Sequence, residues 1–220
     1  MMNLLAIDTA TERCSVAARI NDRWLERSVD TPRGHADIVL SMVDEVLSEA
    51  GLPLRSLDGI AYGRGPGAFT GVRIAIGVVQ GLAFGANLQT AGISNLAAVA
   101  QQFAVPGQQI LACMDARMQE VYWAQFHCEA NGLVSLAGNE RLSAPGAVSS
   151  SQVDVIAGTA LSAYPELASR FPTARQVSAL PRARDILLLG EREFREGCGQ
   201  SAAEAQPVYL RDQVTFVKAG

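Results

Sequence analysis

Two aspartates stand where chemistry could take place, each directly after an apolar run that is typical of a buried strand. Asp8 follows residues 4–7, and Asp115 follows residues 110–114. In proteins that bind Mg-nucleotide, such an aspartate orients the metal or its waters, and a glycine turn brings backbone N–H groups to the phosphates. Neither turn here contains glycine, since they read DTAT and DARM. Two interpretations stay open: a vestigial or partner-assisted cofactor site at Asp8 and Thr9, or two aspartates that cap turns.

The glycine-rich loop at residues 63–68 is a second candidate for phosphate binding. Its sequence, GRGPGA, fits the loose pattern of a dinucleotide-binding loop. Such a loop should follow the first strand of its unit and precede an acidic residue by about 20 positions. Here the loop follows the fourth expected strand, and the matching region holds Ala86, Asn87 and Leu88. A P-loop would need Gly-Lys-Ser/Thr where this chain has Phe-Thr-Gly, so neither phosphate site is well supported.

Metal-binding and nucleophilic chemistry lack the spacing that they need. The two histidines are His35 and His127, and a helical metal pair would place a ligand four residues after His35, where the chain has Val39. The four cysteines include no C-x-x-C pair, which excludes a zinc ribbon or redox motif. We expect free buried thiols, with one disulfide pair as the alternative. No G-x-S-x-G or Cys-His signature is present, and we predict no metal site and no catalytic residue.

The elements that carry these residues alternate between strands and helices. Strands are expected at residues 4–7, 14–20, 24–29, 57–62 and 90–93, and helices at residues 35–50, 70–86 and 94–103. Gly51 ends the first helix, and Thr70 is placed to cap the second. This order is that of a ribonuclease-H-like unit, a mixed sheet with helices packed on it.

The pair Pro106-Gly107 marks the best domain boundary. Beyond it, expected strands at residues 110–114 and 121–126 again flank a polar turn, which indicates a weak internal duplication. A later strand at residues 153–157 and an amphipathic helix at residues 182–196 follow. We predict an N-terminal domain, residues 1–105, that carries the association helices, and a smaller, degenerate C-terminal domain, residues 106–220.

The helix expected at residues 70–86 is apolar almost all round. Arg73, Gly77, Gly81 and Gly85 form one row at i, i+4 spacing, and Gln80 is the one uncharged polar side chain between residues 72 and 86. A helix that is apolar all round must be covered on two sides. Three interior glycines on one face, each costing about 0.5–1 kcal/mol relative to alanine, indicate very close packing there. We favour an outside partner over cover from the same domain, and either the glycine row or the opposite row could face it.

Charge and hydropathy exclude further classes of protein. The formal net charge is −4, with 18 basic and 22 acidic residues, and Lys218 is the one lysine. Without a basic patch, we do not expect the chain to bind nucleic acid unaided. The N-terminus does not resemble a signal peptide. The longest apolar run, residues 72–88, contains Arg73 and Gln80 and is too short for a good membrane span. We expect a cytoplasmic protein without a membrane partner.

A family resemblance is carried by segments spread over nearly the whole chain. They read LAIDTAT at residues 5–11, GRGPGAFTGVRI at 63–74, ISNL at 93–96, DAR at 115–117, EVY at 120–122 and PVYLR at 207–211, together with His35 and its helix. These segments resemble the TsaB (YeaZ) family. The resemblance implies an α/β fold of the actin/Hsp70-like (ASKHA) type, with two ribonuclease-H-like halves and mixed sheets.

The resemblance also implies a function. It implies a scaffold subunit, without an active site of its own, that is required for threonylcarbamoyl modification of adenosine 37 in tRNAs that read ANN codons. The catalytic paralogue TsaD and the small ATPase TsaE are the implied partners, and tRNA is reached only through the complex. A homodimer is implied when the chain is alone. No cofactor of its own is implied, while the complex leaves room for ATP and Mg. The catalytic paralogue uses a His-x-x-x-His helix, and the His35/Val39 pair here fits a lost metal site.

The family's association helices correspond to residues 35–50 and 70–86 of this chain. The residues expected at the partner interface are His35, Ile38, Met42, Val72, Arg73, Ile76, Val79, Gln80 and Ala83. An alternative function is that of an ATP-binding, sugar-kinase-like phosphotransferase or ATPase, which the repeated strand-aspartate pattern favours. A third is a free-standing tRNA-binding protein, which the acidic balance disfavours.

Overall fold

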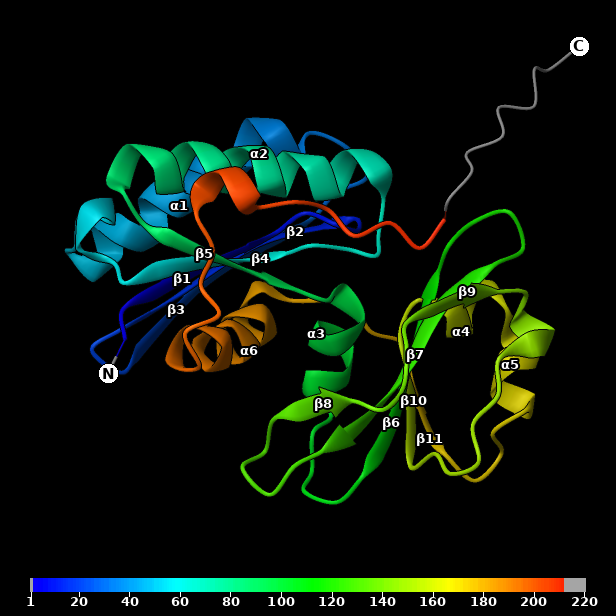
Figure 1. The fold of residues 1–220 in the computed structure, drawn as a ribbon. Coiled ribbons are helices and arrows are strands. Elements are labelled where there is room, and N and C mark those ends of the chain that lie inside the picture. The colour runs from blue at the N-terminus through cyan, green and yellow to red at the C-terminus, as the bar shows by residue number, and fades with distance from the viewer. Residues whose placement is uncertain (1, 212–220) are drawn as a thin grey trace, which may run out of the picture.

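The first half of the chain is built around a five-stranded mixed sheet. A computed structural model describes residues 2–211 of the chain (Figure 1). The strands of the first sheet are β1 (Leu4–Asp8), β2 (Arg13–Ile20), β3 (Arg23–Asp30), β4 (Gly59–Gly63) and β5 (Gln89–Ile93). They lie in the order β3-β2-β1-β4-β5. β1 is antiparallel to β2 and parallel to β4.

The second sheet repeats this topology. Its strands are β6 (Gln109–Asp115), β7 (Val121–Cys128), β8 (Val134–Leu136), β10 (Val155–Ala157) and β11 (Arg175–Val177), and β9 (Arg141–Ser143) also pairs with β7. The order is β11-β10-β6-β7-β8, with β6 antiparallel to β7 and parallel to β10. Read from its other edge, the second order is β8-β7-β6-β10-β11, which matches β3-β2-β1-β4-β5 strand by strand. This match confirms the predicted duplication. Asp8 and Asp115 end the two equivalent central strands.

Helices cover both sheets on both sides (Figure 1). α1 (His35–Ala50) and α2 (Phe69–Ala86) lie on the outer face of the first sheet, and α6 (Ala183–Arg195) lies on its inner face. α3 (Asn95–Gln101) packs between α6 and the second sheet, while α4 (Ala160–Ala163) and α5 (Pro165–Ser169) lie on the far side of that sheet. The layers confirm the predicted α/β class and its two ribonuclease-H-like halves.

The association helices have the bounds that their sequences favour, with one correction. α1 spans residues 35–50 as predicted, because Gly51 adopts a left-handed conformation (φ 65°) and donates its N–H to the carbonyls of Leu47 and Ser48. α2 begins at Phe69, and its N-terminal cap position is Ala68. The prediction that Thr70 caps this helix is therefore wrong: Thr70 lies inside the first turn, and no described side chain caps the helix.

The last helix returns to the first sheet. α6 contacts β1, β2, β4 and β5, and its first residue, Ala183, donates its N–H to Ser15 Oγ on β2 at 3.0 Å. After α6 the chain pairs with β5 through a bridge between Gln200 and Thr90. The boundary at residues 105/106 separates the two sheets, but part of the expected C-terminal domain thus packs on the N-terminal one. Residues 212–220 of that domain, with Lys218, lie outside the described residues.

The largest apolar cluster lies between the two sheets. It joins buried side chains of β1 and β4, such as Leu4 and Ala61, to those of β6, such as Ile110. Leu96 of α3 and Ile186 of α6 fill the layer between them. Because this core is shared by both halves, it fixes the position of one strand-end edge relative to the other.

Candidate functional site

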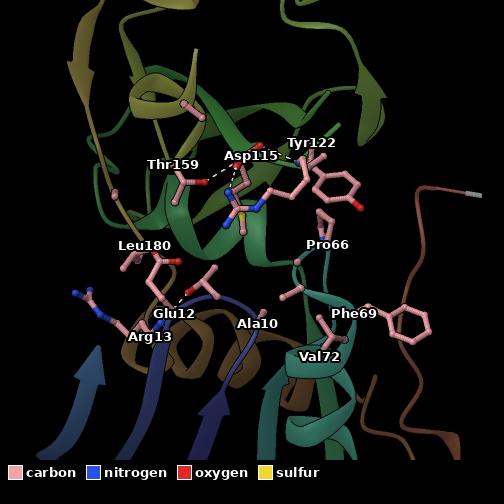
Figure 2. Close-up of a pocket in the computed structure, with 18 of the residues that line it drawn as sticks. Ala10, Glu12, Arg13, Pro66, Phe69, Val72, Asp115, Tyr122, Thr159 and Leu180 are labelled. Carbon is pink, nitrogen blue, oxygen red and sulfur yellow. Dashed lines mark hydrogen bonds and ion pairs between the residues drawn. The ribbon is translucent and has the colours of Figure 1, made fainter. Parts of the chain in front are cut away.

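A cleft of about 1540 Å³ opens between the two halves (Figure 2). Its walls come from the turn after β1, the loop after β4, the turn after β6 and the residues that follow β10. Residues 208–211 of the C-terminal segment complete one side. The carboxyl ends of the parallel strands therefore face the cleft, and this is where α/β proteins hold ligands.

Asp8 lies beneath this cleft and does not line it. The side chain is fully buried, and Oδ1 accepts a 2.7 Å hydrogen bond from Asn95 Nδ2. Oδ2 is buried without a hydrogen-bond partner. Burial raises the pKa of Asp8 to about 6, although the hydrogen bond from Asn95 opposes this effect. Asp8 is therefore shielded from the cleft in the isolated chain, and its cofactor role stays a prediction.

Thr9 connects the turn after β1 to α2. Its hydroxyl donates a 2.6 Å hydrogen bond to the backbone carbonyl of Gly71, and Ala68 donates its N–H to the Ala10 carbonyl at 2.7 Å. A Cβ atom at Gly71 would overlap the Thr9 carbonyl oxygen, so this contact requires glycine. The space that a phosphate would occupy beside a glycine turn is filled here by the chain itself.

Asp115 does line the cleft, and it caps its own turn. Oδ1 accepts hydrogen bonds from the Tyr164 hydroxyl (2.9 Å) and from the backbone N–H of Arg117 (2.8 Å). Oδ2 forms an ion pair with the Arg117 guanidinium at 3.1 Å. Its backbone N–H donates to Thr159 Oγ1 at 2.9 Å (Figure 2). Of the two interpretations of the strand-end aspartates, turn capping therefore describes Asp115.

The positive charges of the cleft are neutralised within the chain. Four arginines line it, and each forms an ion pair: Arg13 with Asp30, Arg117 with Asp115, Arg182 with Asp185 and Arg211 with Glu120. A site for a polyphosphate needs cations or free N–H groups that the ligand can claim. Among the described residues, the arginines that line the cleft offer no unpaired cation.

Two backbone N–H groups of the glycine-rich loop form hydrogen bonds inside the fold. Arg64 donates its backbone N–H to the Ile93 carbonyl, and Gly65 donates to Asn95 Oδ1 at 2.8 Å. Gly67 lies against Ala10, where a Cβ atom would overlap the Ala10 carbonyl oxygen. The loop therefore joins three segments of the first half, and its glycines serve close packing.

The interface residues predicted on α1 lie mainly inside the fold. His35 is buried, and its Nε2 lies 2.7 Å from the Thr11 carbonyl. Met42 is buried beside Cys14, with 3.7 Å between the two sulfurs, and Ile38 is half-buried. In the isolated chain both His35 and Met42 hold α1 against the first sheet and its turn, and their contact with a partner stays a prediction.

The interface residues predicted on α2 also lie mainly inside the fold of the isolated chain. Val72, Ile76, Val79 and Ala83 are buried in the core beneath α2. Gln80 is half-buried and donates to the Ala205 carbonyl at 3.0 Å. Arg73 is exposed, as an interface residue should be. The apolar pattern could not distinguish the inner face of α2 from its outer face, because both faces carry almost only apolar residues.

The outward face of α2 is the row that contains the glycines. Gly77, Gly81 and Gly85 are exposed, and no atom of another described segment lies within 4 Å of the position that a Cβ would take at any of them. Phe69, 57% exposed, and Phe84, 85% exposed, lie near the two ends of this row. We call Phe69, Arg73, Gly77, Gly81, Phe84 and Gly85 the outer row of α2.

α2 is also long and apolar enough, by length and composition, to cross a membrane. Only 33% of it is buried inside the fold, although its inner side packs on the first sheet. Core helices of other proteins pass the same test of length and composition, so this finding is weak evidence. It does show that much of an apolar helix is left uncovered by its own chain.

Within the described residues, the possible metal ligands are not grouped and the cysteine thiols are free. Within residues 2–211, no group of three or more His, Cys, Asp and Glu side chains is placed to hold a metal ion. All four cysteines are free, which confirms the expectation of free thiols; Cys198 is exposed and the other three are buried. Burial raises the pKa of the Cys14 thiol to about 11 and that of Cys113 further, so both stay protonated near neutral pH.

Two residues that sequence reasoning did not assign lie at the edge of the cleft. Tyr209 stacks on Phe69, with 5.9 Å between the ring centroids, and Arg211 pairs with Glu120 of the second half. The sequence signal that could have marked them is the PVYLR segment at residues 207–211. This segment contributed to the family resemblance, but it has no helical or strand periodicity from which its position in the fold could be predicted.

Comparisons with known proteins agree with this architecture. The family model described as "TsaD: tRNA N6-adenosine threonylcarbamoyltransferase" matches residues 29–218. The tRNA threonylcarbamoyladenosine biosynthesis protein TsaB of Escherichia coli is 39% identical, over 99% of this chain and 98% of its own length. The TsaB protein of Haemophilus influenzae is 38% identical, over 99% and 97%.

Solved structures give the same result. YeaZ from Pseudomonas aeruginosa is 41% identical and superposes with a TM-score of 0.84, over 96% of this chain and 100% of that one. A second Pseudomonas aeruginosa structure, described as an uncharacterized protein with similarity to peptidase YEAZ, is 44% identical with a TM-score of 0.87 and the same coverage. The fold is therefore of the ASKHA type, with two mixed-sheet α/β halves.

Proposed function

Because this chain belongs to the TsaB family of tRNA threonylcarbamoyladenosine biosynthesis proteins, we propose that it is a non-catalytic scaffold subunit that docks on a TsaD-like catalytic paralogue. In this proposal the complex transfers the threonylcarbamoyl group to adenosine 37 of tRNAs that read ANN codons. The paralogue carries the chemistry, and this chain supports it.

The observation that carries the proposal is the outer row of α2. Three glycines weaken a helix by about 0.5–1 kcal/mol each, and nothing among residues 2–211 packs against them. Their small size allows another backbone to approach closely, as small residues do where helices pack tightly. Phe84 and Leu40 of α1, both exposed, would be covered by the same partner. An apolar helix that its own chain leaves uncovered is typical of an interaction surface.

The proposal of a non-catalytic subunit is supported by the cleft. Asp8 is buried beneath it, the turn that contains Thr9 is packed on α2, and the lining arginines are paired with carboxylates. The alternative of a sugar-kinase-like phosphotransferase would need an aspartate exposed to the metal and N–H groups directed at the phosphates. We therefore propose no cofactor held by this chain alone, while ATP and Mg would be bound within the complex.

The remaining partners follow from the same surface. Paralogous folds present similar faces, so the outer row that would meet a TsaD-like protein would also meet a second copy of this chain in its absence. We further propose that the small ATPase TsaE joins the complex, that tRNA binds through it, and that the complex is cytoplasmic with no membrane partner. The formal charge of −4 supports indirect contact with tRNA.

The test places bulk on the outer row. Gly77→Leu and Gly81→Leu point into open space in the isolated chain, so the variants should fold, and they should separate the helices across the interface. Gly146→Leu is the matched control, because Gly146 also faces open space but lies in the second half. Co-purification with the TsaD-like paralogue should fall at least tenfold for the two α2 variants and stay unchanged for the control. Undiminished binding by folded Gly81→Leu protein would refute this interface.

A further inference from the structure

A C-terminal strap, residues 206–211, crosses from the first half of the molecule to the second (Figure 1, red). It follows the 3-10 helix at Ala202–Glu204, and two of its backbone N–H groups donate hydrogen bonds to the first half. Gln206 donates its N–H to the Tyr62 hydroxyl at 3.1 Å, and Val208 donates to the Arg64 carbonyl at 2.9 Å. The strap thus has a fixed start beside the glycine-rich loop.

The middle of the strap is stacked on the outer row of α2. The Arg73 guanidinium lies 3.3 Å from the centroid of the Phe69 ring and 5.0 Å from that of Tyr209. The two rings are themselves stacked, with an interplanar angle of 28°. Cation–π contacts of this kind are attractive and depend on geometry. A partner that covers Arg73 would therefore also act on Tyr209.

The end of the strap holds a turn in the second half. Arg211 donates to the Ala116 carbonyl at 3.1 Å and forms a 2.5 Å ion pair with Glu120. Between them, Arg117, Met118 and Gln119 have φ values of 60°, 56° and 60°. Three consecutive left-handed residues with side chains are costly and persist only where surrounding contacts impose them. Arg211 supplies such contacts, since it bonds both ends of the turn.

The same turn forms part of the cleft. Arg117 pairs with Asp115, and Asp115 accepts the hydrogen bond of Tyr164. A continuous series of contacts therefore runs from the outer row of α2 to Asp115: from Arg73 to Tyr209, along the strap to Arg211, and through the turn to Asp115.

We propose that the strap is a latch that couples the outer row of α2 to the conformation of the turn at residues 116–120. The partner part of this inference rests on the proposed function, because the docking protein is what would cover Arg73 and Tyr209. With the stack formed, Arg211 holds the turn in its left-handed form. When the stack is lost, Arg211 leaves the turn, and the turn relaxes and changes the wall of the cleft. A partner that favours the stacked state shifts this equilibrium without touching the turn.

Amide hydrogen exchange in the isolated full chain tests the latch directly. Ala116 donates its N–H to the Glu120 carbonyl, and Glu120 donates to the Arg117 carbonyl, so both amides report the closed turn. Arg211→Gln should raise their exchange rates at least tenfold, and Tyr209→Ala should raise them at least threefold. Tyr209→Phe retains the stack and should exchange like the wild type. Gln206→Ala, an exposed strap residue outside the connection, is the matched control.

Two results would overturn the latch. If both amides exchange at the wild-type rate in Arg211→Gln, the contacts of Arg211 do not hold the turn. If Arg211→Gln accelerates exchange but Tyr209→Ala does not, the stack on α2 is not coupled to the turn. Unchanged melting temperatures would show that the variants remain folded.

A second measurement adds the TsaD-like paralogue. Binding should protect the Ala116 and Glu120 amides at least threefold in the wild-type chain and should leave them unprotected in Tyr209→Ala, at concentrations where both complexes are saturated. Equal protection in both would overturn the coupling. If the paralogue does not bind the wild-type chain, the proposed function fails, while the exchange rates of the isolated variants still decide the latch.

Discussion

The Asn95 side chain donates a 2.7 Å hydrogen bond to Oδ1 of Asp8, and both residues are fully buried. Asn95 also accepts the N–H of Gly65, so one amide joins the end of β1, the glycine-rich loop and the start of α3. Oδ2 of Asp8 has no partner. A buried carboxyl with one hydrogen bond favours its protonated form, and this makes the junction sensitive to pH.

Asp8 should make the stability of the protein fall between about pH 4 and pH 6. Its pKa is raised to about 6 in the folded chain, so over this range the folded state keeps a proton that the unfolded state releases. The free energy of unfolding should therefore decrease as pH rises through the window, by up to about 3 kcal/mol, and then stay level. Asp8→Asn should remove this decrease and stabilise the protein at pH 7.

Urea denaturation between pH 4 and pH 8 measures the effect of Asp8→Asn. Asp44→Asn, on the exposed side of α1, controls for the loss of one negative charge. A variant that kept the wild-type pH dependence would show that Asp8 is not its source.

Thr9→Val should destabilise the protein by about 1–2 kcal/mol, because the buried Gly71 carbonyl loses the hydroxyl that donates to it. Valine has nearly the same shape, so packing changes little. Thr9→Ser keeps the hydroxyl and should lose only the contribution of one methyl group. Chemical denaturation of both variants separates the two effects; equal losses would mean that the hydrogen bond contributes nothing.

Gly81→Ala and Val79→Ala should act in opposite directions on stability and on assembly. Alanine at position 81 meets open space and favours the helix by about 0.5–1 kcal/mol, yet it should weaken docking of the paralogue. Alanine at position 79 removes buried methyl groups and should cost about 1–3 kcal/mol, while docking of the folded protein stays unchanged. Denaturation midpoints and binding isotherms test both; weaker docking by Val79→Ala alone would place the interface on the other side of α2.

Isothermal titration calorimetry of the isolated protein with Mg-ATP should show no binding in the micromolar range. The lining arginines are paired, and the turn that contains Thr9 is closed against α2. Binding that Asp115→Asn abolishes, accompanied by turnover, would instead support the phosphotransferase alternative. Titration with tRNA alone checks the third function, for which a steep dependence on salt concentration is expected.

Sequence patterns predicted the elements better than the faces they expose. The bounds of α1 followed from its apolar spacing and from Gly51, both of which are local features. The sequence could not show which side of α2 is buried, because both sides are apolar. The position of the first sheet decides that Val79 is buried and Gly81 is not. The same limit applies to α6, whose amphipathic pattern predicts a helix but not which sheet it covers.

Local sequence patterns also could not predict the long-range hydrogen bonds and ion pairs around the cleft. The missing turn glycines were visible in the sequence, but the hydroxyl of Thr9 finds Gly71 across 62 positions, and Asp8 finds Asn95 across 87. Arg211 reaches Glu120 across 91 positions. Such pairings depend on the completed fold, so the sequence could suggest which residues matter without showing that they contact one another.

The return of α6 to the first sheet bears on how the protein is made. The inner face of β1 and β4 is covered by residues 183–195, which the ribosome adds after more than four fifths of the chain. Since domains generally fold as they emerge from the N-terminal end, the nascent first half must wait with one apolar face of its sheet open. A chain that stops before Ala183 should therefore expose Leu4 and Ala61 to other polypeptides and aggregate, and synthesis of α6 becomes the step that commits the first half to its native fold.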